Sequence, residues 1–129
     1  MAYTPYVSEL ILDFLFTATV ATRPTAWNVA LFTGDPEVTG AELTDANYVR
    51  QSVTFAVADA DANSRSEATN VAAVTFPDLA AAATVAYVVI FDQSANQLSA
   101  LALNVARDLE IGDVFSVPVG ELIIRGENA

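Results

Sequence analysis

The N-terminal part of the chain carries a helical pattern of apolar side chains. Thr4 and Pro5 supply an N-cap and a proline for the first helical position, where its missing N–H costs nothing. Apolar residues follow at the spacing i, i+3, i+4, i+7 and i+8: Val7, Leu10, Ile11, Phe14 and Leu15. Leu12 and Phe16 widen this stripe. The pattern predicts one helix, which either lies deep in the core or packs on the domain with one face and on a partner with the other.

Beyond this helix, short runs of β-forming residues are divided by turn residues. Val85 to Phe91 is the most apolar run and is predicted to be a central strand. Tyr48 to Val57 alternates, which places Val49, Val53 and Phe55 on one face. Residues 78–83 fit either a short helical turn or a loop. The predicted strands span residues 27–33, 48–57, 70–76, 85–91, 98–104, 114–117 and 122–125.

These elements define the predicted fold class. Helical patterns do not alternate with the strands, so a parallel sheet with crossover helices is not expected. We predict a mainly β fold: an antiparallel β-sandwich or jelly-roll-like barrel of about seven strands with one N-terminal α-helix. The 129 residues fit a single domain. Within it we expect the helix and an arm over residues 1–22 and the β-sandwich over residues 23–129.

Composition adds a hint of a second buried surface. Hydrophobic residues make up 53% of the chain and charged residues 16%, so the chain can fill one core without a metal or a disulfide. The apolar surplus indicates a further contact surface, such as a subunit interface.

The charge balance restricts the partners. The net charge of −11, with five arginines and no lysine or histidine, opposes binding to phosphate backbones and to anionic membranes. No run reaches the roughly 18 uninterrupted apolar residues of a membrane span. We therefore expect neither a nucleic-acid partner nor a membrane. Each arginine is expected to form a local salt bridge or, alternatively, to anchor an interface.

The side chains that most active sites use are missing. Without histidine, cysteine or lysine, the chain cannot form a Ser-His-Asp triad, a Cys-His pair, a zinc site with nitrogen or sulfur ligands, or a Schiff base. We predict no catalytic residues, no cofactor and no enzymatic activity. The alternative is a carboxylate-dependent hydrolase, which would need two buried acids facing a cleft.

One segment has the spacing that opens a calcium-binding loop. Asp59, Asp61 and Asn63 match the D-x-D-x-N pattern. The match then fails, because Ser64 stands where the turn needs glycine and Asn70 where a bidentate glutamate belongs. These three residues are a weak metal candidate only, and they leave a carbohydrate- or calcium-binding β-sandwich module as an alternative function.

Several fragments, in this order, resemble a family of small tailed-phage structural proteins, whose members are described as tail-fibre-like, head-decoration or capsid cement proteins. The most specific fragments are ALFTGDP and YVRQSVTF. The sequence departs from the family pattern at Asp78 to Ala83, where an aromatic residue and a glycine are expected before the next strand. The fragments are ELILDFLF (9–16), WNVALFTGDP (27–36), YVRQSVTF (48–55), VTFP (74–77), YVVIFD (87–92), LSALAL (98–103) and IGDVFSVPVGELI (111–123).

The resemblance implies a non-enzymatic virion component on the outer capsid surface or on the tail. The first hypothesis is a capsid decoration or cement protein, which binds the major capsid protein or other virion proteins and forms a homo-oligomer. The alternative is a tail or fibre-base component. We expect the contacts on the helix and on the loops near residues 35–47 and 59–69. The interface candidates on the helix are Val7, Leu10, Ile11, Phe14 and Leu15.

Overall fold

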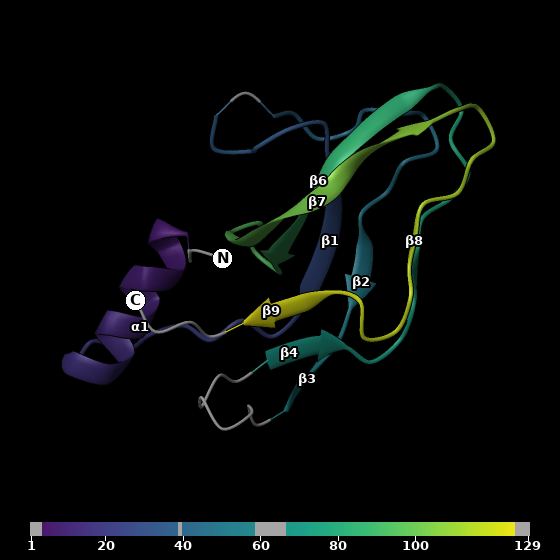
Figure 1. The fold of residues 1–129 in the computed structure, drawn as a ribbon. Helices are drawn as coiled ribbons and strands as arrows, with labels where there is room; N and C mark the ends of the chain where they lie inside the picture. The colour runs from purple at the N-terminus through teal and green to yellow at the C-terminus, as the bar shows by residue number, and fades with distance from the viewer. Residues whose placement is uncertain (1–3, 39, 59–66, 126–129) are drawn as a thin grey trace.

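The computed structural model describes residues 4–38, 40–58 and 67–125. It confirms a mainly β fold with antiparallel strands and one N-terminal helix (Figure 1). The elements are α1 (Pro5–Phe16), β1 (Trp27–Phe32), β2 (Gln51–Val53), β3 (Phe55–Ala58), β4 (Glu67–Asn70), β5 (Val74–Thr75), β6 (Ala83–Asp92), β7 (Gln97–Leu109), β8 (Ser116–Val117) and β9 (Ile123–Arg125).

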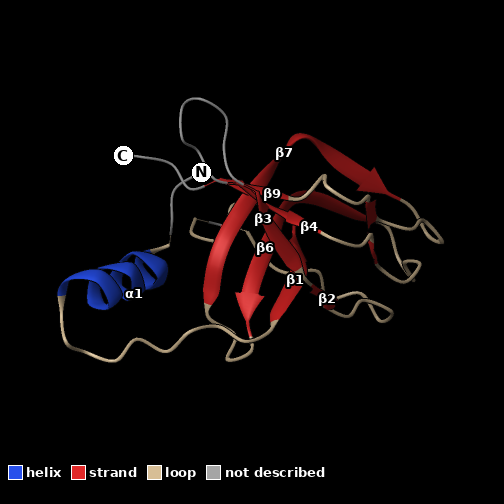
Figure 2. Ribbon diagram, turned by 90° about the horizontal axis from the view of Figure 1, so that it is seen from below, coloured by secondary structure: helices blue, strands red, loops and turns tan. Residues whose placement is uncertain are grey.

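The strands form three small sheets with a shared core. The largest has the order β2-β1-β6-β7, the second the order β3-β4-β9, and the third pairs β5 with β8. Strand β6 lies between β1 and β7, and its residues from Val88 to Asp92 are all buried. This confirms the prediction of a central strand over 85–91. Figure 2 shows the strands packed together, with α1 set to one side and joined to β1 by an extended loop.

The buried residues of β1 and β6 serve two faces of the sheet. Successive side chains of a strand point to opposite faces. Val29, Leu31, Val88 and Ile90 therefore point into the main core, where the other sheets cover them. A smaller cluster fills the opposite face with Ala30, Phe32, Val89 and Phe91. Burial on both faces explains why these strands read as continuous apolar runs.

The predicted strand over 48–57 is two strands in two different sheets. Strand β2 pairs with β1, whereas β3 pairs with β4, and the chain passes from one sheet to the other at Thr54. Val53 is buried and Phe55 is half-buried, but Val49 is 61% exposed, so its predicted place on their face is wrong. Residues before Gln51 do not pair with β1, which frees them from the alternation of the strand.

Two polar side chains fix the segments between strands. Asn70 is buried, and its amide donates to the carbonyls of Ala72 and Pro118 while its Oδ1 accepts the N–H groups of Gly120 and Leu122. The Asp45 carboxylate accepts backbone N–H groups of residues 80, 81 and 47. These hydrogen bonds lower the pKa of Asp45. They hold residues 78–82 as a loop, which decides between the two predicted conformations.

The loop after β1 doubles back on itself through two glycines. The N–H of Gly40 donates to the carbonyl of Asp35 at 2.7 Å. A Cβ atom added to Gly40 would collide with the backbone of Gly34, whereas a Cβ added to Gly34 would meet only ordinary contacts, the nearest at 3.4 Å. Position 40 therefore requires glycine because the two backbones approach so closely.

We predict that Gly40→Ala lowers the free energy of unfolding by about 2 kcal/mol or more, because the two backbones must separate. Gly34→Ala is the matched control and should change the stability by less than about 0.5 kcal/mol. Urea denaturation of both variants measures the difference. Equal stability of the two variants would contradict the close approach.

Candidate interaction surface

Helix α1 is fixed to the β-sandwich at its first turn. The Thr4 hydroxyl accepts the N–H of Val7 at 3.3 Å, which confirms the predicted N-cap, and it donates to the carbonyl of Gln97 at 2.7 Å. The Tyr6 side chain forms a hydrogen bond with Asp92. Both partners border the turn between β6 and β7. The helix is thus attached to this turn through polar contacts.

Asp92 holds the turn between β6 and β7 in one conformation through hydrogen bonds. It is only 3% exposed, and its carboxylate accepts the N–H groups of Ser94 and Asn96 and the side-chain amide of Asn96, at 2.8–3.0 Å. Burial alone would raise the pKa of Asp92, but the hydrogen bonds from Asn96, Ser94 and Tyr6 together outweigh it and lower the pKa below its ordinary value. The carboxylate stays ionised and holds the turn in place.

Beyond its first turn, α1 leaves most of its apolar surface uncovered. No residue of the helix is buried, so the alternative of a helix deep in the core is wrong. Val7, Leu10 and Ile11 are half-buried, whereas Phe14 is 75% and Leu15 60% exposed. Three further apolar side chains are also exposed nearby: Leu12, Phe16 and Val20.

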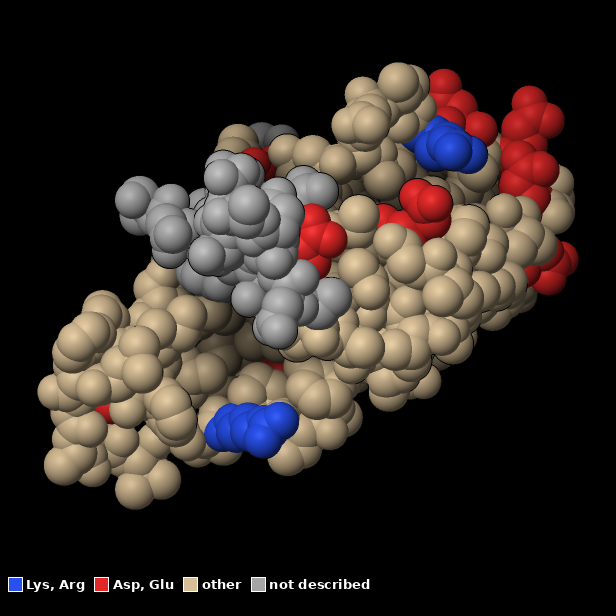
Figure 3. All heavy atoms as spheres, turned by 60° about the horizontal axis from the view of Figure 1, so that its bottom comes forward, with Lys and Arg blue, Asp and Glu red and all other residues tan. Residues whose placement is uncertain are grey.

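An open apolar groove lies between α1 and the arm that leads to β1. Its volume is about 500 Å³. Arg23 lies in its wall and is exposed, and no carboxylate in the described ranges pairs with it. Figure 3 shows the helix end of this face largely without acidic side chains, which gather at the opposite end. The lining residues are Leu10, Ile11, Phe14, Leu15, Ala21, Arg23 and Pro24.

A second groove, of about 720 Å³, runs along β7 beside residues 114–118. Arg107 contributes to its wall and also has no ion pair within the described ranges. The turn that follows β7 carries Ile111, which is 73% exposed. This region therefore carries an exposed arginine and an exposed large apolar side chain, as the first groove does with Arg23 and Phe14, but at a different place on the molecule.

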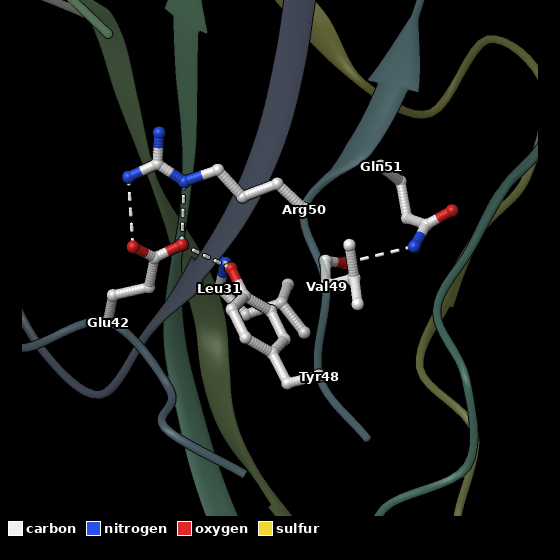
Figure 4. A network of polar contacts seen from close by, with 6 residues as sticks. All are labelled: Leu31, Glu42, Tyr48, Val49, Arg50 and Gln51. Atoms are coloured by element: carbon white, nitrogen blue, oxygen red, sulfur yellow. Dashed lines mark hydrogen bonds and ion pairs between the residues drawn. The ribbon is translucent and has the colours of Figure 1, made fainter. Parts of the chain in front are cut away.

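Three ionisable side chains form a polar cluster beside β1: Glu42, Tyr48 and Arg50 (Figure 4). Arg50 binds the Glu42 carboxylate through two hydrogen bonds of 2.8 and 2.9 Å, and the Tyr48 hydroxyl donates to it at 2.6 Å. The N–H of Leu31 donates to the Tyr48 hydroxyl at 3.0 Å. The Arg50 guanidinium also lies 4.0 Å from the centre of the Phe91 ring.

The pKa shifts in this cluster indicate a structural role. The hydrogen bond from Arg50 lowers the pKa of Glu42 despite partial burial. Burial and then the hydrogen bond to Glu42 raise the pKa of Tyr48. At neutral pH, Glu42 is therefore a carboxylate and Tyr48 a neutral phenol, so neither is poised for proton transfer. What the cluster provides is an acceptor for the Leu31 N–H, since the pairing of β1 with β2 ends at Val29.

The predicted cation site falls on Asp59, Asp61 and Asn63, which lie outside the described residues. Among the residues that the structure places, no three acidic side chains come together in a way that could hold a metal ion. Over the same residues, no helix has the length and apolarity needed to cross a membrane.

Comparison with known proteins assigns the chain to a family. The family model described as "Podophage GP4 fiber I protein gp80" matches residues 2–125. The chain belongs to this family. The predicted resemblance to small tailed-phage structural proteins is thereby confirmed, and the chain is a virion component. No curated protein matches it.

Sequence reasoning identified the helix of this fibre I family member but missed the side chains that surround it. A local salt bridge is one expectation for each arginine; among the described residues Arg50 forms one, whereas Arg23 and Arg107 do not. Alternation in the 48–57 segment puts Arg50 on the face opposite Val53 and Phe55, but it gives no signal that Glu42 is its partner. Nothing in the local sequence marks Tyr6 or Asp92 as an anchor for the helix.

We predict that Tyr48→Phe lowers the free energy of unfolding by about 1–3 kcal/mol, because the buried N–H of Leu31 loses its acceptor. Tyr87→Phe is the control, because the Tyr87 hydroxyl makes no hydrogen bond within the described ranges. Thermal unfolding of both variants measures the effect. A loss at Tyr48 no larger than at Tyr87 would refute this role.

The lowered pKa of Glu42 also predicts a pH dependence. A carboxyl with a lowered folded pKa stabilises the fold above its unfolded value, here 4.5, and this contribution is lost as the pH falls through the folded pKa. Unfolding titrations between about pH 6 and pH 3 should show a shallower decline for Glu42→Gln than for the parent chain. Glu37→Gln is the control, because no ion pair joins Glu37 to an arginine among the described residues.

Proposed function

We propose that this chain is a non-enzymatic structural component of the phage tail fibre and that it acts by binding other virion proteins through α1 and the arm. The family description supports a fibre position. The observation that carries the proposal is the geometry of α1, which is fixed to the sandwich by polar contacts yet leaves Phe14, Leu15 and Phe16 exposed.

The energetics of exposure support this use of the helix. Covering a large apolar side chain is worth about 1.5–3 kcal/mol relative to leaving it in water. In the isolated chain, several large apolar side chains of α1 stay in water, so this stabilisation is not gained. Apolar side chains gathered in one exposed place are typical of an interaction site. We propose that the predicted interface residues Val7, Leu10, Ile11, Phe14 and Leu15 contribute to that site together with the arm.

The family description favours the fibre position over the capsid decoration that was the first hypothesis from the sequence. Both positions would use the same kind of apolar contact surface. We further propose that the chain is one domain, with residues 1–22 as helix and arm and residues 23–129 as the sandwich. The absence of histidine, cysteine and lysine supports a role without catalysis.

Labelling of intact particles with a specific antibody tests the position of the protein. We expect label on the tail and a small, fixed number of copies per particle by quantitative gel analysis. Label spread over the capsid, at a copy number that matches the capsid lattice, would contradict the fibre assignment and favour decoration.

Substitution of Phe14 tests the contact surface. Phe14→Ser should fold like the parent chain, because the side chain is 75% exposed, but it should enter particles several-fold less efficiently. Ile111→Ser, at 73% exposure in a turn remote from the helix, is the matched control and should assemble normally. Circular dichroism checks the fold. Equal incorporation of both variants would refute the role of α1.

A further inference from the structure

The groove beside α1 and the outer surface of the same helix complement each other. The groove has walls of Leu10, Ile11, Phe14 and Leu15 and one cation, Arg23, which forms no ion pair among the described residues. Glu9, Leu12 and Phe16 follow the spacing i, i+3 and i+7, so they share another face of α1. That face is apolar with one exposed acid, and within the described ranges the Glu9 carboxylate has no partner.

Arg23 and Glu9 belong to different sides of the helix. Glu9 lies on the helix face roughly opposite the residues that line the groove, and no ion pair joins it to Arg23 in the same chain. An exposed arginine in an apolar wall is unusual in a chain with a net charge of −11. A second copy of the chain can supply both an apolar surface for the groove and an acid for Arg23.

We propose that the outer face of α1 from one copy, formed by Glu9, Leu12 and Phe16, docks in the groove of a second copy, with Glu9 paired to Arg23. The inference rests on the proposed function of α1 as the contact surface and names its occupant. Because the two docking surfaces differ, the contact is heterologous and joins copies head to tail, as a closed ring where the rotation between neighbouring copies closes. Neighbouring apolar side chains shield the ion pair, which gives the contact its specificity.

The uncovered apolar area sets the size of such a contact. At three-quarters exposure, Phe14 and Phe16 each leave on the order of 150 Å² in water. Leu12, Leu15 and Val20 together add about as much again, so each chain offers on the order of 600 Å² of apolar surface at the helix and arm. A standard interface buries about 800 Å² per partner, of which somewhat more than half is apolar. Each contact covers one docking surface of each copy, which is about half of this apolar surface, so a single contact is smaller than a standard interface; every copy makes two such contacts in the assembly, one through each surface.

Charge reversal at the two ends of the proposed ion pair provides the test. Sedimentation analysis of the purified full chain should give a defined oligomer whose mass is a multiple of 13.6 kDa. R23E alone and E9R alone each place like charges together and should weaken association at least about tenfold. The double variant R23E/E9R should recover it.

Mixing the two single variants distinguishes contact between chains from an effect within one chain. An equimolar mixture of R23E and E9R should form hetero-oligomers in which the two variants alternate, because a contact between unlike variants joins opposite charges. R107E is the matched control, since Arg107 is exposed and has no ion pair within the described ranges but lies on β7 away from the groove. This variant should associate like the parent chain.

Three results would overturn the inference: a chain that is monomeric at all accessible concentrations, an oligomer that R23E leaves intact, or a mixture that fails to associate. A monomeric chain whose Phe14→Ser variant still fails to enter particles would show that another virion protein occupies the groove. In that case the inference fails while the proposed function stands. The proposed function fails separately if Phe14→Ser assembles normally.

Discussion

The backbone of β1 must be hydrogen-bonded on both sides of a buried strand, and the β-sandwich is arranged around this requirement. Strand β6 serves one edge over the full length of β1, but β2 serves the other only as far as Val29 before the chain leaves for the second sheet. Leu31 is fully buried just beyond that point. The returning loop supplies a donor to its carbonyl from Leu43, and Tyr48 supplies the acceptor for its N–H. The chain leaves the first sheet after β2, and the Tyr48 hydroxyl of the polar cluster then supplies the hydrogen-bond acceptor that β2 does not provide for Leu31.

The helix is attached by a different principle. Burial of apolar side chains stabilises the sandwich. Helix α1 contributes no buried residue and is attached through the hydrogen bonds of Thr4 and Tyr6. Hydrogen bonds of this kind are individually worth about 1 kcal/mol, so they orient the helix without covering it. The molecule thus consists of a sandwich with its own core and an apolar element left available for assembly. A stable sandwich with an exposed apolar helix suits a member of a virion fibre family.

The sequence predicted the parts of the fold that depend on local pattern. The apolar run over 85–91 identified the central strand, and Thr4-Pro5 marked the start of the helix. Local alternation could not show that the 48–57 segment divides at Thr54, because both sheets require the same period of two. Periodicity also showed which side of α1 is apolar but not what covers it. Whether Arg23 has an ion-pair partner depends on the positions of carboxylates far away in the sequence, which a local sequence pattern does not show.

The central claim is that α1 is covered by protein in the assembled virion. The chain contains no cysteine, so single thiols introduced by Phe16→Cys and Ile111→Cys can report on their surroundings in intact particles. The account predicts that the thiol at position 16 reacts with a maleimide at least about tenfold more slowly in particles than in the unfolded chain. The thiol at position 111 should remain freely reactive. Equal, rapid labelling of both positions in intact particles would contradict the account.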